Sequence, residues 1–176
     1  MGICGKLVLR RCICWLTEGH MAHSVESLEE AASRLVADDR AMDEFNRAAI
    51  REFRSNQGKV GGQLEGMALL LLTTKGARSG RSLTRPLAYS RDGKRLVIIA
   101  SYGGGPRNPP WYYNLLAHPI AGVEVGTEKF EVRATLASGA ERQRLYEAQA
   151  RELPIFTNYQ RKTKRQIPVL TLTRID

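Results

Sequence analysis

A short turn that contains two glycines carries the residues best suited to bind an anion. The turn spans residues 75–81 (KGARSGR) and directly follows an apolar run at residues 67–74. Between Glu65 and Asp92 the chain has no acidic residue and five cationic ones, which are Lys75, Arg78, Arg81, Arg85 and Arg91. Arginine guanidinium groups match the geometry of phosphate and carboxylate groups and donate several hydrogen bonds at once. The turn therefore predicts a site for a small polyanionic ligand.

A second candidate element is the glycine run Gly103-Gly-Gly105. It has neither the GxGxxG spacing of dinucleotide sites nor the lysine of a P-loop, so both of those fingerprints are absent. Two interpretations remain open: the backbone N–H groups approach a ligand closely, or the glycines only form a tight corner. The following Asn108-Pro-Pro-Trp111 has the pattern of a helix start, and the positive end of that helix would favour an anion. The basic turn and the glycine loop would then flank one site that holds an anion beside a flat ring.

Three aromatic residues at this helix start, Trp111, Tyr112 and Tyr113, are candidates to contact such a ring. Helical geometry sends them to different sides, so one or two of them belong to the core. Trp111 lies nearest the glycine loop in sequence and is the best candidate ring neighbour. Asn114 lies one turn later and has two open interpretations: it orients a polar ring edge, or it is a satisfied buried amide.

The composition narrows the class of ligand. The 176 residues include 27 Lys and Arg against 18 Asp and Glu, a formal net charge of +9. The cations are not confined to one tract, and the densest group lies beside glycines next to a buried strand, so we expect no nucleic-acid partner. The three cysteines are Cys4, Cys12 and Cys14, and the three histidines show no metal-ligand spacing. We therefore expect no metal site, and a cysteine-free body that suits a reducing cytoplasm.

Residues 1–20 mix apolar side chains with Lys6, Arg10 and Arg11, and no small-residue cleavage site follows them. One interpretation is a disordered leader, with Met21 as an alternative start, and the other is a short amphipathic helix in peripheral membrane contact. We place the end of this leader at residue 25. Residues 26–176 are expected to form one domain, since their length suffices for one hydrophobic core.

Capping boxes at residues 27–30 and 138–141 predict two helix starts. Residues 38–41 interrupt the first helix, and the helix that follows runs to about residue 55. An apolar stripe on that second helix predicts core packing: its members are Met42, Phe45, Ala49 and Phe53. Residues 57–62 form a glycine-rich connector, which is a candidate for a flexible lip over the site.

Runs of apolar and alternating residues predict about six strands. The run at residues 67–74 predicts a strand buried on both faces, because it is apolar almost throughout. A second strand is expected to end at a hairpin turn at residues 91–94. Further strands are expected at residues 95–102, 120–126, 128–137 and 167–175, with a helix at 111–118. Strands that follow one another without helices favour an α+β class and a mostly antiparallel sheet, a barrel rather than a Rossmann alternation.

Taken together, the motifs resemble the deazaflavin-dependent nitroreductase family. They are Leu71-Leu-Thr-Thr-Lys-Gly-Ala-Arg-Ser-Gly80, Arg85-Pro-Leu87, Ala100-Ser-Tyr-Gly-Gly104, Asn108-Pro-Pro-Trp-Tyr-Tyr-Asn114, Ala117-His-Pro119, Glu124-Val-Gly126, and Tyr159-Gln followed by Ile167-Pro-Val169. Phe45-Asn46 and Ile50-Arg-Glu-Phe53 also resemble the family's N-terminal helix. The resemblance implies a split β-barrel, related to the flavin-mononucleotide-binding barrels, with N-terminal and inserted helices. It also implies that the chain binds coenzyme F420, an 8-hydroxy-5-deazaflavin with a phosphodiester-linked lactyl-oligoglutamate tail.

The same resemblance implies which residues contact the cofactor. The expected set is Lys75, Arg78, Ser79, Arg81, Arg85, Pro86, Leu87, Ala100, Ser101, Tyr102, Gly103, Gly104, Pro109, Trp111 and Asn114. Within it, Arg78 and Ser79 match residues that contact the tail. Leu83 stands where the family often has an arginine, so Arg81 or Arg85 would have to replace that arginine. Phe156 stands where some nitro-reducing members have a tyrosine.

The implied activity is hydride transfer from reduced F420 to a hydrophobic acceptor, with quinones as the first class and nitroaromatics as the second. Tyr159 and Ser101 are the catalytic candidates, as proton sources, with water as the default. Two alternatives remain open: the same barrel using flavin mononucleotide, and a deazaflavin carrier without turnover. The fold alone does not separate the three.

Overall fold

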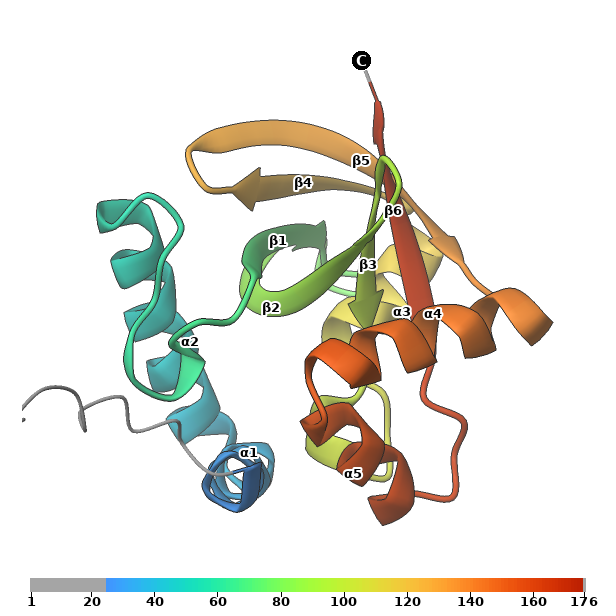
Figure 1. Ribbon diagram of the computed structural model, residues 1–176. Coiled ribbons are helices and arrows are strands. Elements are labelled where there is room, and N and C mark those ends of the chain that lie inside the picture. Colours follow the sequence, from blue (N-terminus) through green and yellow to red (C-terminus); the bar gives the residue numbers. More distant parts are fainter. Residues whose placement is uncertain (1–24, 176) are drawn as a thin grey trace, which may run out of the picture.

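The computed structural model describes residues 25–175, in which a sheet closed on itself is flanked by helices (Figure 1). The helices are α1 (Val25–Ala37), α2 (Asp39–Ser55), α3 (Pro110–Ala117), α4 (Gly139–Glu152) and α5 (Ile155–Lys162). The strands are β1 (Leu69–Lys75), β2 (Ser82–Asp92), β3 (Arg95–Ile99), β4 (Ile120–Val125), β5 (Glu128–Leu136) and β6 (Val169–Ile175). Short 3₁₀ turns lie at Gly62–Leu64 and Tyr102–Gly104. The predicted α+β class is confirmed.

In the part of the chain that the structure describes, no helix is both long enough and apolar enough to cross a membrane. The two interpretations of residues 1–20, as a leader or as a membrane-contact helix, concern residues outside the described range.

The strands form a closed antiparallel barrel in the order β1-β2-β3-β6-β5-β4, and β4 pairs back onto β1. Closure removes the free strand edges that an open sheet would have to protect. Two of the strand connections are tight hairpins, because Asp92 pairs with Arg95 and Val125 pairs with Glu128. Gly93 lies in the first hairpin turn with a φ of 60°, which two-residue hairpin turns require. Both hairpins and the barrel agree with the sequence prediction.

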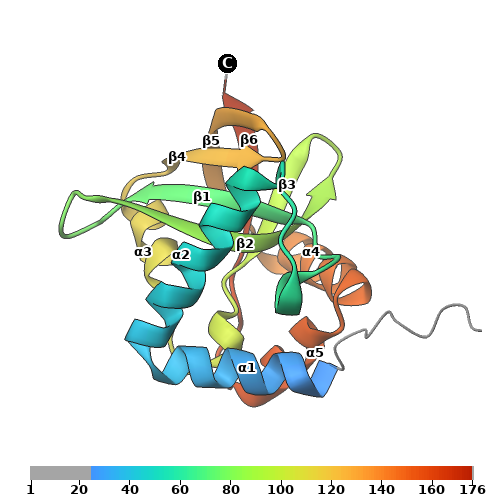
Figure 2. The same ribbon diagram turned by 90° about the vertical axis from the view of Figure 1, so that its left-hand side faces the viewer.

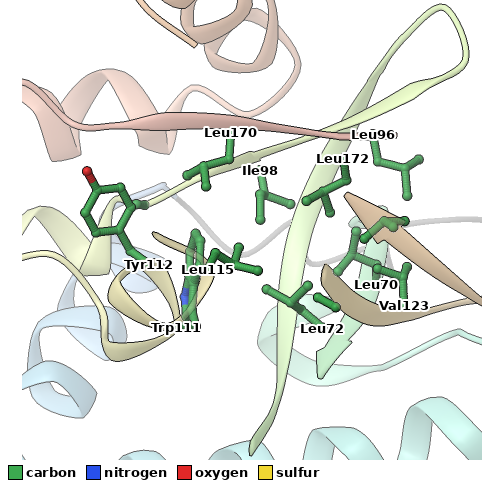
Figure 3. Close-up of a cluster of buried hydrophobic side chains, with 13 residues drawn as sticks. Leu70, Leu72, Leu96, Ile98, Trp111, Tyr112, Leu115, Val123, Leu170 and Leu172 are labelled. Carbon is green, nitrogen blue, oxygen red and sulfur yellow. The ribbon is translucent and has the colours of Figure 1, made fainter. Parts of the chain in front are cut away.

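β1 is buried on both sides and belongs to two hydrophobic clusters. Leu70 and Leu72 lie in the barrel interior (Figure 3), whereas Leu69 and Leu71 lie in one cluster with Phe53 of α2. Successive side chains of a strand point to opposite faces, so a strand covered on both sides needs an unbroken apolar run. All four leucines are at most 5% exposed, which confirms the prediction for residues 67–74. Burying each leucine stabilises the fold by about 1.5–3 kcal/mol, so β1 fixes the position of α2 on the barrel.

α2 crosses the outside of the barrel over β1 and β2 (Figure 2). Its C-terminal half is anchored there: Ala49 and Phe53 are buried, and the Arg54 guanidinium donates to the two Glu124 carboxylate oxygens at 2.6 and 3.1 Å. Hydrogen bonding to Arg54 holds the pKa of Glu124 below its usual range, so the carboxylate stays charged. This anchorage holds the N-terminal half of α2 in place above the site.

Asp38 separates α1 from α2 by capping the second helix. Its Oδ1 atom accepts hydrogen bonds from the N–H groups of Arg40 and Ala41, at 2.9 and 3.1 Å. Such a cap is typical of helix starts, and the predicted break at residues 38–41 is confirmed. The predicted helix start at residues 27–30 is wrong, because α1 is already present at Val25 and Ser27 lies inside it.

The second predicted capping box marks the start of a helix correctly, but its capping hydrogen bonds do not form. Ser138 is the N-cap residue of α4, yet its side chain makes no capping hydrogen bond. Glu141 instead accepts a hydrogen bond from Arg95 of β3 at 2.9 Å, and this ion pair draws the carboxylate away from the helix start. β3 also ends earlier than predicted, at Ile99. Tyr102 takes a φ of 49°, which a continuing strand does not allow.

Candidate active site

Two adjoining cavities bring together most of the predicted site residues. The larger cavity has a volume of about 890 Å³ and the smaller one a volume of about 420 Å³. Both volumes are usual for small-molecule sites. Asp39, Tyr102 and Pro110 line both cavities, so a long ligand can extend from one into the other.

The larger cavity is cationic. Arg78 and Arg81 of the basic turn line it, as does Arg107 from the loop before α3. Among the described residues Asp39 is the one acidic residue in its wall, so three arginines against one carboxylate give a net charge of +2. Arg107 was not predicted, and its position after the glycine loop was the available signal. Ser79 also lines this cavity, whereas Lys75 lines neither.

Asn114 holds the basic turn in place. Its Oδ1 atom accepts a hydrogen bond from the Ala77 N–H at 3.0 Å, and its Nδ2 atom donates to Thr74 Oγ1 at 3.0 Å. The side chain is buried, at 7% exposed, although Asn114 lies at the cavity wall. Of the two open interpretations, the structure therefore favours the satisfied buried amide. Its effect on the site is to position the turn that carries the arginines.

The two arginines that could replace the one missing at Leu83 lie in different cavities. Leu83 and Arg81 line the larger cavity together. Arg85 lines the smaller cavity, where its guanidinium donates to Asp43 Oδ1 of α2 at 2.8 Å. Arg81 therefore shares a cavity with Leu83, whereas Arg85 is already paired with a carboxylate.

The walls of the smaller cavity combine apolar and polar side chains from several elements. Pro86 and Leu87 come from β2, Trp111 from α3 and Met42 from α2. Trp111 is 5% exposed and also belongs to the barrel core (Figure 3), so its indole ring is held rigidly at the wall. The predicted contacts Pro109, Ser101, Tyr102 and Gly103 line this cavity as well. The apolar part of this wall offers a surface for a flat ring.

The contribution of α2 was missed from sequence. Its apolar stripe was assigned wholly to the core, but only Ala49 and Phe53 are buried there. Met42, Asp43 and Asn46 line the smaller cavity instead. The signal that could have shown this is Asn46, a polar residue on the same helix face as the stripe.

Tyr159 of α5 lines the smaller cavity, and Phe156 does not. Phe156 packs in the cluster under α4 and α5, with its ring centroid 5.8 Å from that of Tyr159. Of these two positions singled out from the sequence, Tyr159 therefore lies at the cavity and Phe156 in the core. Burial, reinforced by the charge of Glu29, raises the pKa of the Tyr159 phenol well above its usual value. The phenol is neutral at physiological pH and can donate a hydrogen bond.

The glycine loop is a tight corner under two helices. A Cβ atom at Gly104 would lie 2.9 Å from the backbone oxygen of Tyr159, and one at Gly103 would lie 3.0 Å from a methyl group of Val36. Both glycines also have positive φ values, of 78° and 60°. Close packing against α5 and α1 therefore explains why glycine is needed. Ala100 and Gly104 are buried behind the cavity wall and do not line it.

Arg165 holds this corner together. Its guanidinium donates to the carbonyl oxygens of Ser101 at 2.6 Å, Gly105 at 3.0 Å and Ala100 at 3.2 Å. It also donates to Asn108 Oδ1 at 2.6 Å. Burial lowers the pKa of Arg165 but leaves it charged. The sequence showed Arg165 only as one of four basic residues near the C-terminus, because its partners lie about sixty positions earlier.

Two other predicted features contribute less. The start of α3 offers few N–H donors, because Pro109 and Pro110 have none and Trp111 supplies the first. The connector at residues 57–62 lines neither cavity, and Gly58 lies against Gly126 at the β4–β5 turn. Within residues 25–175 no group of three or more His, Cys, Asp or Glu side chains could hold a metal ion.

Comparison with known proteins identifies the family. A family model described as F420H(2)-dependent quinone reductase matches residues 45–174, which is most of the chain. The chain belongs to this family. An F420H(2)-dependent quinone reductase of Mycobacterium tuberculosis (strain H37Rv) is 39% identical over 126 residues, which are 69% of this chain and 85% of that protein. The resemblance found from the motifs is thereby confirmed.

Solved structures agree with this assignment to the F420H(2)-dependent quinone reductase family. An F420-H2 dependent reductase, FDR-A, has a TM-score of 0.56 at 33% identity and covers 60% of this chain and 93% of its own. A structure described as a domain-swapped dimer has a TM-score of 0.58 at 30% identity and covers 76% of this chain and 97% of its own. The chain is an F420H2-dependent reductase with the split-barrel fold, and coenzyme F420 is its cofactor.

The two cavities fit this cofactor. The tail of F420 carries a phosphate and several carboxylates, and the larger cavity offers the guanidinium groups of Arg78, Arg81 and Arg107. The deazaflavin is a flat ring, and the smaller cavity offers the apolar wall formed by Pro86 and Trp111. Because the cavities adjoin, one molecule with a ring and a charged tail can satisfy both.

Proposed function

We propose that this protein binds reduced F420 with its tail on the arginines of the larger cavity and its ring in the smaller one, and reduces a quinone there. The observation that carries the proposal is that a cationic cavity adjoins one with an apolar wall, the two cavities sharing Asp39, Tyr102 and Pro110. A quinone is flat, uncharged and apolar, so the same apolar wall suits it. Nitroaromatics share those properties and are expected as secondary acceptors.

The residues of the smaller cavity would orient the reaction and exclude water. Bound F420 in its reduced form supplies a hydride, and a quinone becomes a quinol by taking up that hydride and one further proton. Holding two flat partners in register on a rigid wall such as Trp111 lowers the entropic part of the barrier. Exclusion of water protects the hydride donor from side reactions.

Tyr159 is proposed to act as a hydrogen-bond donor to the acceptor and not as the source of the proton. A quinol is itself a phenol, and burial raises the pKa of Tyr159 above that of an ordinary phenol. Proton transfer from Tyr159 to the quinolate oxygen that hydride addition leaves would therefore run uphill. Ser101 lines the same cavity, but a serine hydroxyl is a weaker acid still, so water is the expected proton source.

Two alternative functions would use the cavities differently. Flavin mononucleotide carries one terminal phosphate and would leave part of the three-arginine cavity unused. A carrier without turnover would need no room for an acceptor beside the cofactor ring. Both alternatives predict a different outcome from the reductase proposal in the following experiment.

The test compares binding and turnover in one preparation. Calorimetric titration with oxidised F420 and with flavin mononucleotide, in moderate salt, is expected to show tighter binding of F420. Anaerobic mixing with reduced F420 and menadione is expected to oxidise F420 and consume the quinone in equal amounts. Tighter binding of flavin mononucleotide would contradict the choice of cofactor, and F420 binding without turnover would indicate a carrier.

A further inference from the structure

Asn46 is a polar residue on an otherwise apolar face of α2. Met42, Asn46, Ala49 and Phe53 follow at spacings of three or four, so they share one side of the helix. Ala49 and Phe53 are buried against the barrel, while Met42 and Asn46 line the smaller cavity. A leucine at position 46 would continue the stripe, yet the chain has an amide at this position.

The amide of Asn46 is buried and lacks a partner. The residue is 5% exposed, and within the described part of the chain its Nδ2 atom makes no hydrogen bond. Buried amides are normally paired, because an unpaired one destabilises the fold. One helical turn earlier, Asp43 is already engaged with Arg85 at 2.8 Å. The wall of the smaller cavity thus retains an unused hydrogen-bond donor.

The charges around Asn46 favour a neutral acceptor. Asp39 and Asp43 line the smaller cavity with one arginine, Arg85, so the wall carries a net charge of −1 among the described residues. A carboxylate or phosphate would be repelled there, whereas a carbonyl oxygen on a flat ring would not. Rotation about the last side-chain bond of Asn46 exchanges its two amide atoms, so Nδ2 can turn toward such a ligand.

We infer that the Asn46 amide donates a hydrogen bond to a carbonyl oxygen of the flat ring bound in the smaller cavity. Both the deazaflavin and a quinone carry such oxygens. The inference rests on the proposed function and adds to it a ligand-contacting residue from α2. It also explains why an unpaired polar group is kept on this helix face.

The test uses two substitutions and a matched control. Asn46→Leu keeps the approximate size and removes the donor, and Asn46→Asp keeps the shape and replaces the donor with a charged acceptor. The control is Gln149→Leu in α4. Gln149 is fully buried, its Nε2 atom has no partner among the described residues, and it lines neither cavity.

The first measurement is calorimetric titration with oxidised F420, and the second is the KM and kcat for menadione with saturating reduced F420. A donor to the deazaflavin predicts F420 binding about twofold to tenfold weaker in Asn46→Leu. A donor to the quinone predicts unchanged F420 binding and a menadione kcat/KM lower by the same factor. In either case the affected quantity, F420 affinity or menadione kcat/KM, is expected to fall further in Asn46→Asp than in Asn46→Leu. Gln149→Leu is expected to change neither quantity.

Thermal unfolding without ligand gives an independent check. Because the unpaired amide destabilises the free protein, Asn46→Leu is expected to have a melting temperature equal to or higher than the wild type. If Asn46→Leu does not fold, the F420 titration and the menadione kinetics are measured on Asn46→Asp instead. Wild-type values for both ligands in both variants would overturn the inference. If the wild type binds F420 but reduces no quinone, the proposed function fails, and the F420 titration alone then decides the role of Asn46.

Discussion

The two cavities are neighbours, but they are built in different ways. The larger one takes two of its three arginines from the turn at residues 75–81 and carries a net charge of +2 among the described residues. The smaller one is assembled from residues as far apart as Met42 and Tyr159, and its wall carries one arginine against two aspartates. Most of the arginines of the larger cavity therefore come from one turn, whereas the wall of the smaller cavity is assembled from several elements. Substitutions that separate the two cavities test this contrast.

The largest effect is expected at the corner that both cavities share. Arg165→Met would leave four hydrogen-bond acceptors of the loop before α3 without their donor. We expect the free energy of unfolding to fall by about 4 kcal/mol and the affinity for F420 to fall with it. Urea unfolding and F420 titration measure the two effects. Arg161→Met, an exposed residue of the same segment, is the control and should change neither by more than about 0.5 kcal/mol.

A matched pair of glycines compares the two sites directly. Gly104→Ala should lower the free energy of unfolding by about 3 kcal/mol, because its Cβ would lie 2.9 Å from a backbone oxygen of α5 at a φ of 78°. Gly80→Ala, in the basic turn, has a similar φ of 66° but no atom within 4 Å, so only about 1 kcal/mol is expected. Urea unfolding of both variants measures the difference. Equal losses would show that backbone strain, and not packing against α5, explains Gly104.

Removing one cation should affect the larger cavity alone. Arg78→Ala is expected to weaken F420 binding by about 2 kcal/mol, the range for a hydrogen bond to a charged group, with unfolding nearly unchanged. The loss should shrink as salt is raised, since Arg78 is exposed and its interactions are screened. Titrations at low and high salt measure this, with the exposed Arg151→Ala as the control of equal charge. Loss of the folded state in Arg78→Ala would show that the turn is structural.

Removing one hydroxyl should affect the smaller cavity alone. Tyr159→Phe is expected to lower kcat for menadione by about 1 kcal/mol in activation free energy, the contribution of one neutral hydrogen bond. Binding of F420 should change less than kcat does. Steady-state rates with reduced F420 decide between the two roles of Tyr159. An unchanged kcat would leave Tyr159 as a wall residue only.

The smallest effect is expected from pH. The pKa of Tyr159 is raised in the folded protein, so its neutral phenol stabilises the fold below about pH 10, the pKa of free tyrosine, and that contribution is lost at higher pH. Between about pH 6 and 9 the phenol should not titrate. The pH profiles of kcat for the wild type and Tyr159→Phe should therefore run parallel. An inflection present only in the wild type would assign a proton transfer to Tyr159.

Patterns within a few residues predicted the local features of the fold correctly. The apolar run at 67–74 predicted a doubly buried strand, the turn at 91–94 predicted a hairpin, and Asp38 marked a helix break. Prediction failed where a distant partner competed for a group. Glu141 pairs with Arg95 and so does not complete its capping box.

For the site, the sequence by itself determined the cationic turn and the likeness to F420-dependent reductases. Lys75, Arg78 and Arg81 are close together in the chain whatever the fold is, and each motif is a contiguous stretch. Only the tertiary structure decided which polar groups already have partners: Arg85 is paired with Asp43, and Asn114 with the backbone of Ala77. Burial and hydrogen-bond pairing depend on neighbours brought together by folding. For the same reason Asn46, Arg107 and Arg165 could be placed at the site only once the barrel and α2 were in position.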